Sequence, residues 1–180
     1  KAADLFFEFG FRATTMSQIA KVMGLTKPGL YHYISSKSDL LSDILTYAMD
    51  TLEGEVLAPA REIADPRHRL AFVVEGHLRS IASHGCRLTV AFDEARHLPD
   101  PLRKSIQARQ NAYFEFLRNT LAEIKQTGEL RSRSVGLAAA FVLMTVEASA
   151  RWLMEADDVD TEFMLAETAE YILTGALRPA

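Results

Sequence analysis

Apolar residues recur every three or four positions along almost the whole chain, and this spacing is the feature that most restricts its fold. The stretches from Leu70 to Ile81 and from Leu102 to Ile124 each place such residues on one face of a helix. We find no stretch that alternates apolar and polar residues as a half-buried strand does, and no two-residue hairpin signal. An all-α fold is therefore expected.

Glycines, prolines and capping residues divide this pattern into separate helices. Gly10 and Gly24 are expected to end helices, Thr26 to cap one with Pro28 in its first turn, and the run Ser36 to Asp39 to open a long one. The expected helices cover residues 2–9, 17–23, 27–34, 37–48, 70–81, 88–97, 102–124, 134–154 and 160–173. Gly175 is expected to end the last.

Interruptions of the helical pattern predict that the chain forms two structural units. Pro59 and the pair Asp65-Pro66 interrupt the helical pattern after the first fifty residues. We therefore expect an N-terminal helix-turn-helix unit of three helices over residues 1–48. A larger helical bundle is expected over residues 49–180.

Composition excludes several classes of protein. Of the 180 residues, 48% are hydrophobic and 24% charged, as in ordinary globular proteins, and no apolar run approaches the roughly 18 residues of a membrane span. The single cysteine, Cys86, cannot form an intrachain disulfide or a Cys-rich zinc site. With no signal-peptide layout at its start, the chain is expected in the cytoplasm and away from membranes.

Enzymatic and metal chemistry have little support. The chain has no phosphate-binding glycine loop and no nucleophile elbow, so no catalytic residue and no cofactor are assigned. The pairs His77/His84 and Glu94/His97 have spacings that could hold a metal, but no third ligand accompanies either pair. We therefore predict neither an enzyme nor a metal site.

One segment stands out against the formal net charge of −4. Between Glu8 and Asp39 there is no acidic residue, while Arg12, Lys21 and two further lysines are basic. A surface that approaches phosphates excludes carboxylates, because each would repel the DNA backbone. The layout of two short helices around the turn that contains Gly24 is that of a helix-turn-helix.

The second of these helices offers groups that suit a nucleic acid. Lys27, Tyr31 and His32 can donate hydrogen bonds, and Gly29 allows a close approach of the backbone to a groove. Thr15, Ser17, Tyr33 and Lys37 lie at or near helix N-termini, where phosphate oxygens can be held. The alternative is that Tyr31 and Tyr33 are partly buried core aromatics and the lysines only solvate the surface.

The stretch TTMSQIAKVMGLTKPGLYHYISSKSDLL resembles the DNA-binding signature of TetR-type bacterial transcriptional regulators. The preceding DLFFEFGFRAT is similar to the end of that family's first helix, so the resemblance covers Ala2 to about Ala48. The resemblance implies the following DNA-contacting residues: Thr15, Ser17, Lys27, Pro28, Gly29, Tyr31, His32, Tyr33 and Lys37. His32-Tyr33 departs from the pair found in many members, so base preference cannot be transferred.

The resemblance also implies a homodimer formed through the last two helices, and a small-molecule effector. The small residues Ala138 to Ala140 and Ala148 to Ala150 are compatible with close packing there, although such stripes are also ordinary internal packing. The end of the chain, together with GHLRSI, resembles TetR-type regulators of lipid, steroid or aromatic-acid catabolism, whose effectors are often acyl-CoA thioesters.

An apolar effector pocket is proposed in the bundle, although a residue of this kind is more often simply part of the core. Its candidate residues are Phe72, His77, Phe92, Tyr113, Leu117, Phe141, Met144 and Trp152.

The leading hypothesis is thus a repressor released from a palindromic operator by an acyl-CoA or another apolar acid. The rival is an all-helical enzyme or small-molecule-binding protein whose N-terminal helix pair is purely structural.

Overall fold

The structure is a computed structural model that describes residues 1–155 and 160–179, and the side chains of these residues except 150–155. Within that part the regular structure is helical, and the only strand-like pairing is an isolated antiparallel bridge between Leu130 and Leu177. The predicted all-α fold is confirmed. The predicted ligand residue Trp152 has its side chain outside the described residues.

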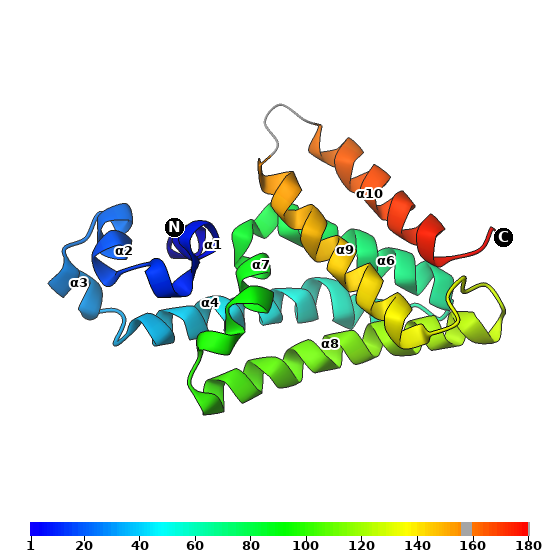
Figure 1. The fold of residues 1–180 in the computed structure, drawn as a ribbon, viewed down its shortest axis with the longest axis horizontal. Coiled ribbons are helices and arrows are strands. Elements are labelled where there is room, and N and C mark those ends of the chain that lie inside the picture. Colours follow the sequence, from blue (N-terminus) through cyan, green and yellow to red (C-terminus); the bar gives the residue numbers. More distant parts are fainter. Residues whose placement is uncertain (156–159, 180) are drawn as a thin grey trace.

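Three short helices form the N-terminal head. They are α1 (Ala2–Ala13), α2 (Met16–Met23) and α3 (Lys27–Tyr31), which lie at one end of the molecule beside the start of α4 (Lys37–Leu52) (Figure 1). Phe6, Ile19, Leu30 and Leu41 are each at most 1% exposed and belong to the hydrophobic core. Their burial fixes α2 and α3 relative to α1 and α4.

Two helix ends in the head differ from the prediction. Gly10 leaves the helical conformation with a φ of 77°, as expected of a stop, but the chain then resumes a helical turn as far as Ala13. The third helix ends at Tyr31 and does not reach Ile34. The backbone N–H groups of Tyr33 and Ile34 both donate to the carbonyl of Leu30, at 3.0 and 3.2 Å, so the hydrogen-bond ladder stops advancing there.

Pro59 does not break the chain where a boundary was expected. α4 continues into a π-helical turn, η1 (Glu53–Leu57), and then into the short α5 (Ala58–Arg61). Pro59 lies in the first turn of α5, where a missing N–H costs little. The predicted boundary at residue 48 falls inside α4, which also contacts α7 and α8 of the bundle. Head and bundle therefore share one helix.

The bundle consists of the remaining helices. They are α6 (Pro66–His84), α7 (Cys86–Asp93), the 3₁₀ turn η2 (Ala95–His97), α8 (Asp100–Gln126), α9 (Val135–Glu155) and α10 (Thr161–Ala176). α9 packs against α6, α7 and α8, and α10 lies outside α6 and α9 (Figure 1). Asp160 caps α10 as predicted, but Gly175 remains helical and the helix ends where Leu177 becomes extended.

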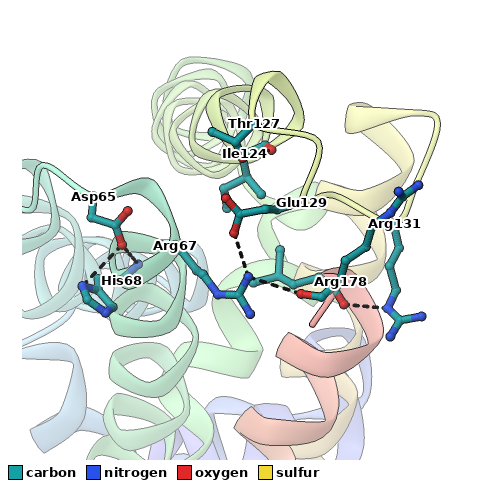
Figure 2. Close-up of polar contacts among 9 residues, drawn as sticks. Asp65, Arg67, His68, Ile124, Thr127, Glu129, Arg131 and Arg178 are labelled. Carbon is teal, nitrogen blue, oxygen red and sulfur yellow. Dashed lines mark hydrogen bonds and ion pairs between the residues drawn. The ribbon is translucent and has the colours of Figure 1, made fainter. Parts of the chain in front are cut away.

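At the end of the bundle far from the head, hydrogen bonds hold the last residues of the chain in place (Figure 2). Arg67 Nη1 donates to Glu129 Oε2 at 2.7 Å and to the carbonyl of Arg178 at 3.2 Å. Arg131 Nε donates to the carbonyl of Leu177 at 2.5 Å. The hydrogen bond from Arg67 holds the pKa of Glu129 below its ordinary value. These bonds join α6, the α8–α9 loop and the chain after α10.

Candidate DNA interface and ligand-binding core

The helix-turn-helix is built by local capping. The Thr15 hydroxyl accepts from the N–H of Gln18 at 3.3 Å, and the Gln18 side chain accepts from the N–H of Thr15 at 2.8 Å. Gly24 ends α2 with a φ of 73°, a conformation that only glycine adopts at little cost. Thr26 then caps α3 by accepting from the N–H of Gly29 at 3.1 Å.

Gly29 has a structural role as well as its predicted closeness to DNA. A Cβ added at this position would lie 3.1 Å from the capping oxygen of Thr26, which is tighter than ordinary van der Waals contact. A larger residue would therefore press on the cap that begins α3.

The predicted DNA-contacting residues lie together on this head and are mostly exposed. Tyr33 is 79% and Tyr31 46% exposed, so Tyr33 is not a core aromatic. Gly29 and Lys37 are partly buried. The exposed members of the predicted set are Thr15, Ser17, Lys27, Pro28, Tyr31, His32 and Tyr33.

The basic side chains of the acid-free segment are free to meet an anion. Arg12, Lys21 and Lys27 are exposed, and none of them forms an ion pair within the described part of the chain. Because no carboxylate neutralises them from within their segment, their positive charge faces solvent.

Lys37 is different. Its Nζ donates to the carbonyls of Phe11 at 2.7 Å and Thr14 at 2.8 Å, and lies 4.3 Å from the centre of the Phe11 ring. The ammonium thus binds the carbonyls at the end of α1 and joins that end to the start of α4. Its predicted phosphate contact would have to be made in addition to these bonds.

The same segment of α1 touches the bundle. The His97 ring stacks on Phe11 with 5.6 Å between ring centres and 14° between the planes. His97 Nε2 lies 3.2 Å from a carboxylate oxygen of Glu94, a residue that is only 8% exposed. Phe11 therefore lies between Lys37 of the head and η2 of the bundle.

Three helices bring a polar cluster into the bundle core. His77 of α6 is 1% exposed and Tyr113 of α8 is 3% exposed, and Tyr113 Oη lies 2.9 Å from His77 Nδ1. Glu147 of α9 places Oε1 3.2 Å from His77 Nε2. Burial, and secondly the charge of Glu147, raise the pKa of Tyr113, so its hydroxyl keeps its proton.

Apolar predicted ligand residues surround part of this cluster. The Phe92 ring centre on α7 lies 6.1 Å from that of His77, and Leu117 on α8 is 1% exposed. The structure therefore brings together His77, Phe92 and Tyr113, and the buried Leu117 lies one helical turn after Tyr113 on α8. Sequence reasoning missed Glu147, although it is the only acidic residue between Glu129 and Glu155.

Three other predicted ligand residues, Phe72, Phe141 and Met144, lie elsewhere. Phe72 is 36% exposed on the outer side of α6, and Phe141 and Met144 are 63% and 64% exposed on α9. Phe141 and Met144 face away from the core because the buried face of α9 is formed by Ala138, Ala139, Val142 and Val146.

The exposed side of α9 is apolar from Leu137 to Ala148. Leu137, Phe141, Met144 and Ala148 are spaced four, three and four residues apart, so they share one helix face, and all are exposed. On α10, Phe163 is 61% and Tyr171 77% exposed. A groove between the two helices is lined by residues that include Phe141, Val142, Tyr171 and Ile172.

The remaining chemical candidates do not form a second site. Within residues 1–149 and 160–179 no three His, Cys, Asp or Glu side chains are placed to hold a metal ion. No helix in the described part of the chain is both long and apolar enough to cross a membrane.

Cys86 is held in an unreactive state. Burial, aided by its hydrogen bond to Asp4 Oδ1 at 3.1 Å, raises the pKa of the thiol to about 12.

Since the thiolate is the nucleophile, we expect an aromatic disulfide reagent at pH 8 to label native Cys86 at least about 100-fold more slowly than the denatured chain. Equal rates before and after denaturation would contradict this placement. Asp4→Asn should accelerate labelling only modestly, because burial is the larger cause.

Comparison with known proteins agrees with these features. Residues 1–44 match the family described as "Bacterial regulatory proteins, tetR family", and residues 64–176 match "Tetracyclin repressor-like, C-terminal domain". The HTH-type transcriptional repressor KstR2 of Rhodococcus jostii (strain RHA1) is 28% identical over 180 residues, covering 99% of this chain and 88% of that protein.

Two further relatives cover nearly the whole chain. The fatty acid metabolism regulator protein of Bacillus subtilis (strain 168) is 25% identical over 176 residues, covering 97% of this chain and 91% of that protein. The crystal structure of AibR in complex with isovaleryl coenzyme A and operator DNA has a TM-score of 0.84 at 28% identity, covering 99% of this chain and 95% of that chain. The matched family of bacterial regulatory proteins and the transcriptional repressor KstR2 confirm the predicted class of protein.

Proposed function

The chain belongs to the tetR family of bacterial regulatory proteins, and we propose that it acts in the cytoplasm as a homodimeric repressor released from its operator by an effector in the bundle. The observation that carries the proposal is the exposed, acid-free surface of α2 and α3. There Lys27, in the first turn of the capped helix α3, and Tyr33, two residues after its end, face solvent. Positive charge and exposed aromatic rings at one place suit a DNA groove.

Within this surface the residues divide into two roles. Thr15 and Ser17 lie at the N-terminus of α2, where hydroxyl and N–H groups hold phosphate oxygens. Lys27, Tyr31 and His32 lie on or beside α3 and reach toward base edges. The first group sets affinity and register, and the second sets sequence preference.

We expect Lys27→Ala and His32→Ala to lose discrimination between the operator and a mutated operator by roughly 1–3 kcal/mol each, because a base contact is removed. The measurement is a gel-shift titration of both duplexes. Arg133→Ala is the matched control, because it removes one exposed cation from the α8–α9 loop, at the end far from the head. An equal loss on both duplexes would assign Lys27 and His32 to the backbone instead.

The homodimer follows from the small reach of one head. α3 has five residues, which span only about 7 Å along its axis. One such helix contacts too few bases to separate an operator from competing genomic sites, whereas two heads on a twofold axis double the contacts and require a palindrome. The apolar stripe of α9, from Leu137 to Ala148, and the adjacent surface of α10 are the proposed dimer face.

The proposed effector is an acyl-CoA or a similar apolar acid. Support comes from AibR, which was crystallised with isovaleryl coenzyme A and operator DNA, and from the relative in Bacillus subtilis that is named a fatty acid metabolism regulator. The cluster of His77, Phe92, Tyr113 and Leu117 offers the polar and apolar groups that a ligand pocket combines.

Release requires that the effector favour an arrangement of the heads that does not fit DNA. α7 carries Phe92 beside the cluster and leads directly into η2, where His97 stacks on Phe11. Phe11 in turn contacts Lys37 at the start of α4. A shift of α7 would therefore be transmitted to the head through the contacts of His97 with Phe11 and of Phe11 with Lys37.

A further inference from the structure

The polar cluster in the bundle contains hydrogen-bonding atoms without partners. His77 Nε2 and both carboxylate oxygens of Glu147 are buried, and none has a hydrogen-bond partner among the described residues. The 3.2 Å between Nε2 and Oε1 is close enough for an ion pair but lacks the alignment of a hydrogen bond. Buried polar atoms are normally satisfied, so three unsatisfied ones at one place need an explanation.

The donors and acceptors of each side chain show which hydrogen-bond partners the cluster lacks. An ionised carboxylate only accepts, and His77 has one N–H in its neutral form. If that N–H is on Nδ1, it donates to Tyr113 Oη and leaves Nε2 as another acceptor facing Glu147. If it is on Nε2, it serves at best one of the two oxygens of Glu147. In either tautomer, and equally in the imidazolium with both N–H groups, at least one oxygen of Glu147 is left without a donor.

Apolar side chains and four helices surround these acceptors. Helices α6, α7, α8 and α9 converge here, and Phe92 and Leu117 provide apolar surface. The side chain of Glu147 is still 18% exposed, although its oxygens are buried. The acceptors therefore lie close to the protein surface, and a ligand need not cross the whole core to reach them.

We propose that His77, Tyr113 and Glu147 form the polar end of the effector site, and that they bind an uncharged group bearing N–H or O–H. This inference rests on the proposed function, because it assigns the chemistry of the effector site. A carboxylate at this position would be repelled by Glu147. In an acyl-CoA, the amide N–H groups of the pantetheine arm have the required chemistry, and the phosphates would lie away from the cluster.

The test uses three probes with the same eight-carbon chain: octanamide, octan-1-ol and octanoate. Binding to the full dimeric chain is measured by calorimetry in the absence of DNA. We expect octanamide and octan-1-ol to bind at least about tenfold tighter than octanoate, since only they donate a hydrogen bond without adding a negative charge. Glu147→Gln, which removes the charge at nearly constant volume, should reduce this preference to within about threefold.

Two controls separate the site from general effects. Glu75→Gln changes an exposed carboxylate on α6, the helix that also carries His77, and should keep the wild-type preference. Glu147→Met should lose the preference as Glu147→Gln does, and it replaces the latter if that variant does not fold. The inference is overturned if octanoate binds as tightly as the other probes to the wild type, if both variants keep the preference, or if no probe binds. A probe that binds but does not release DNA would instead count against the proposed function.

Discussion

Phe141→Glu is expected to convert the proposed homodimer into monomers and to weaken operator binding by at least about 100-fold. Phe141 is 63% exposed in the centre of the apolar stripe of α9, beside Tyr171 of α10. In a twofold interface the substitution places two carboxylates in apolar surroundings, each costing several kcal/mol. Operator binding then falls because one head contacts only one half-site.

The measurement is light scattering coupled to size exclusion at micromolar concentration, followed by operator titration. Leu102→Glu is the matched control, because Leu102 is 36% exposed on α8 outside the proposed dimer face. Leu102→Glu should melt close to the wild type, whereas Phe141→Glu should keep the wild-type helical content and melt lower, because the loss of a partner subunit lowers the melting temperature. A Phe141→Glu variant that remains dimeric and binds the operator normally would show that the interface lies elsewhere.

Lys37→Ala is expected to lower the free energy of unfolding by about 2–3 kcal/mol. The substitution leaves the carbonyls of Phe11 and Thr14 without the ammonium that now lies 2.7 and 2.8 Å from them, and hydrogen bonds to charged groups contribute roughly this much. The measurement is chemical denaturation. Lys37→Met, which keeps the aliphatic stem against Phe11, should recover part of the loss, and an alanine variant as stable as the wild type would contradict the assignment.

The same variants separate structure from DNA contact. If the ammonium also holds a phosphate, both Lys37→Ala and Lys37→Met should weaken binding to all sequences and lower the salt slope by about one unit. An unchanged slope would leave Lys37 with its structural role alone.

The helix-turn-helix of the head could be predicted, apart from some helix ends and the capping box of Thr15, because its signals are local. Thr15, Gly24 and Thr26 act through hydrogen bonds or backbone angles within a few residues, and these capping rules can be applied to a sequence directly. The exposure of Tyr33 also agrees with its predicted role, although its contact with DNA remains a prediction.

The bundle was less predictable because its site depends on contacts distant in sequence. His77, Tyr113 and Glu147 belong to three helices, and their spacing gives no sign that they meet. Helical periodicity places the apolar residues Phe141 and Met144 on one face of a helix. It does not show whether that face points to the core or to a second chain. Lys37 shows the same limit, since its bonds to Phe11 and Thr14 span more than twenty residues.

Salt titration of binding to a palindromic operator selected from random DNA tests the central claim most directly. If the acid-free face of α2 and α3 binds phosphates in two copies, the logarithm of the binding constant should fall linearly with the logarithm of salt concentration. The slope should correspond to about four or more neutralised phosphates per dimer, and complexes should contain two chains per duplex. Absence of a selected sequence, or binding that does not change with salt, would contradict the account.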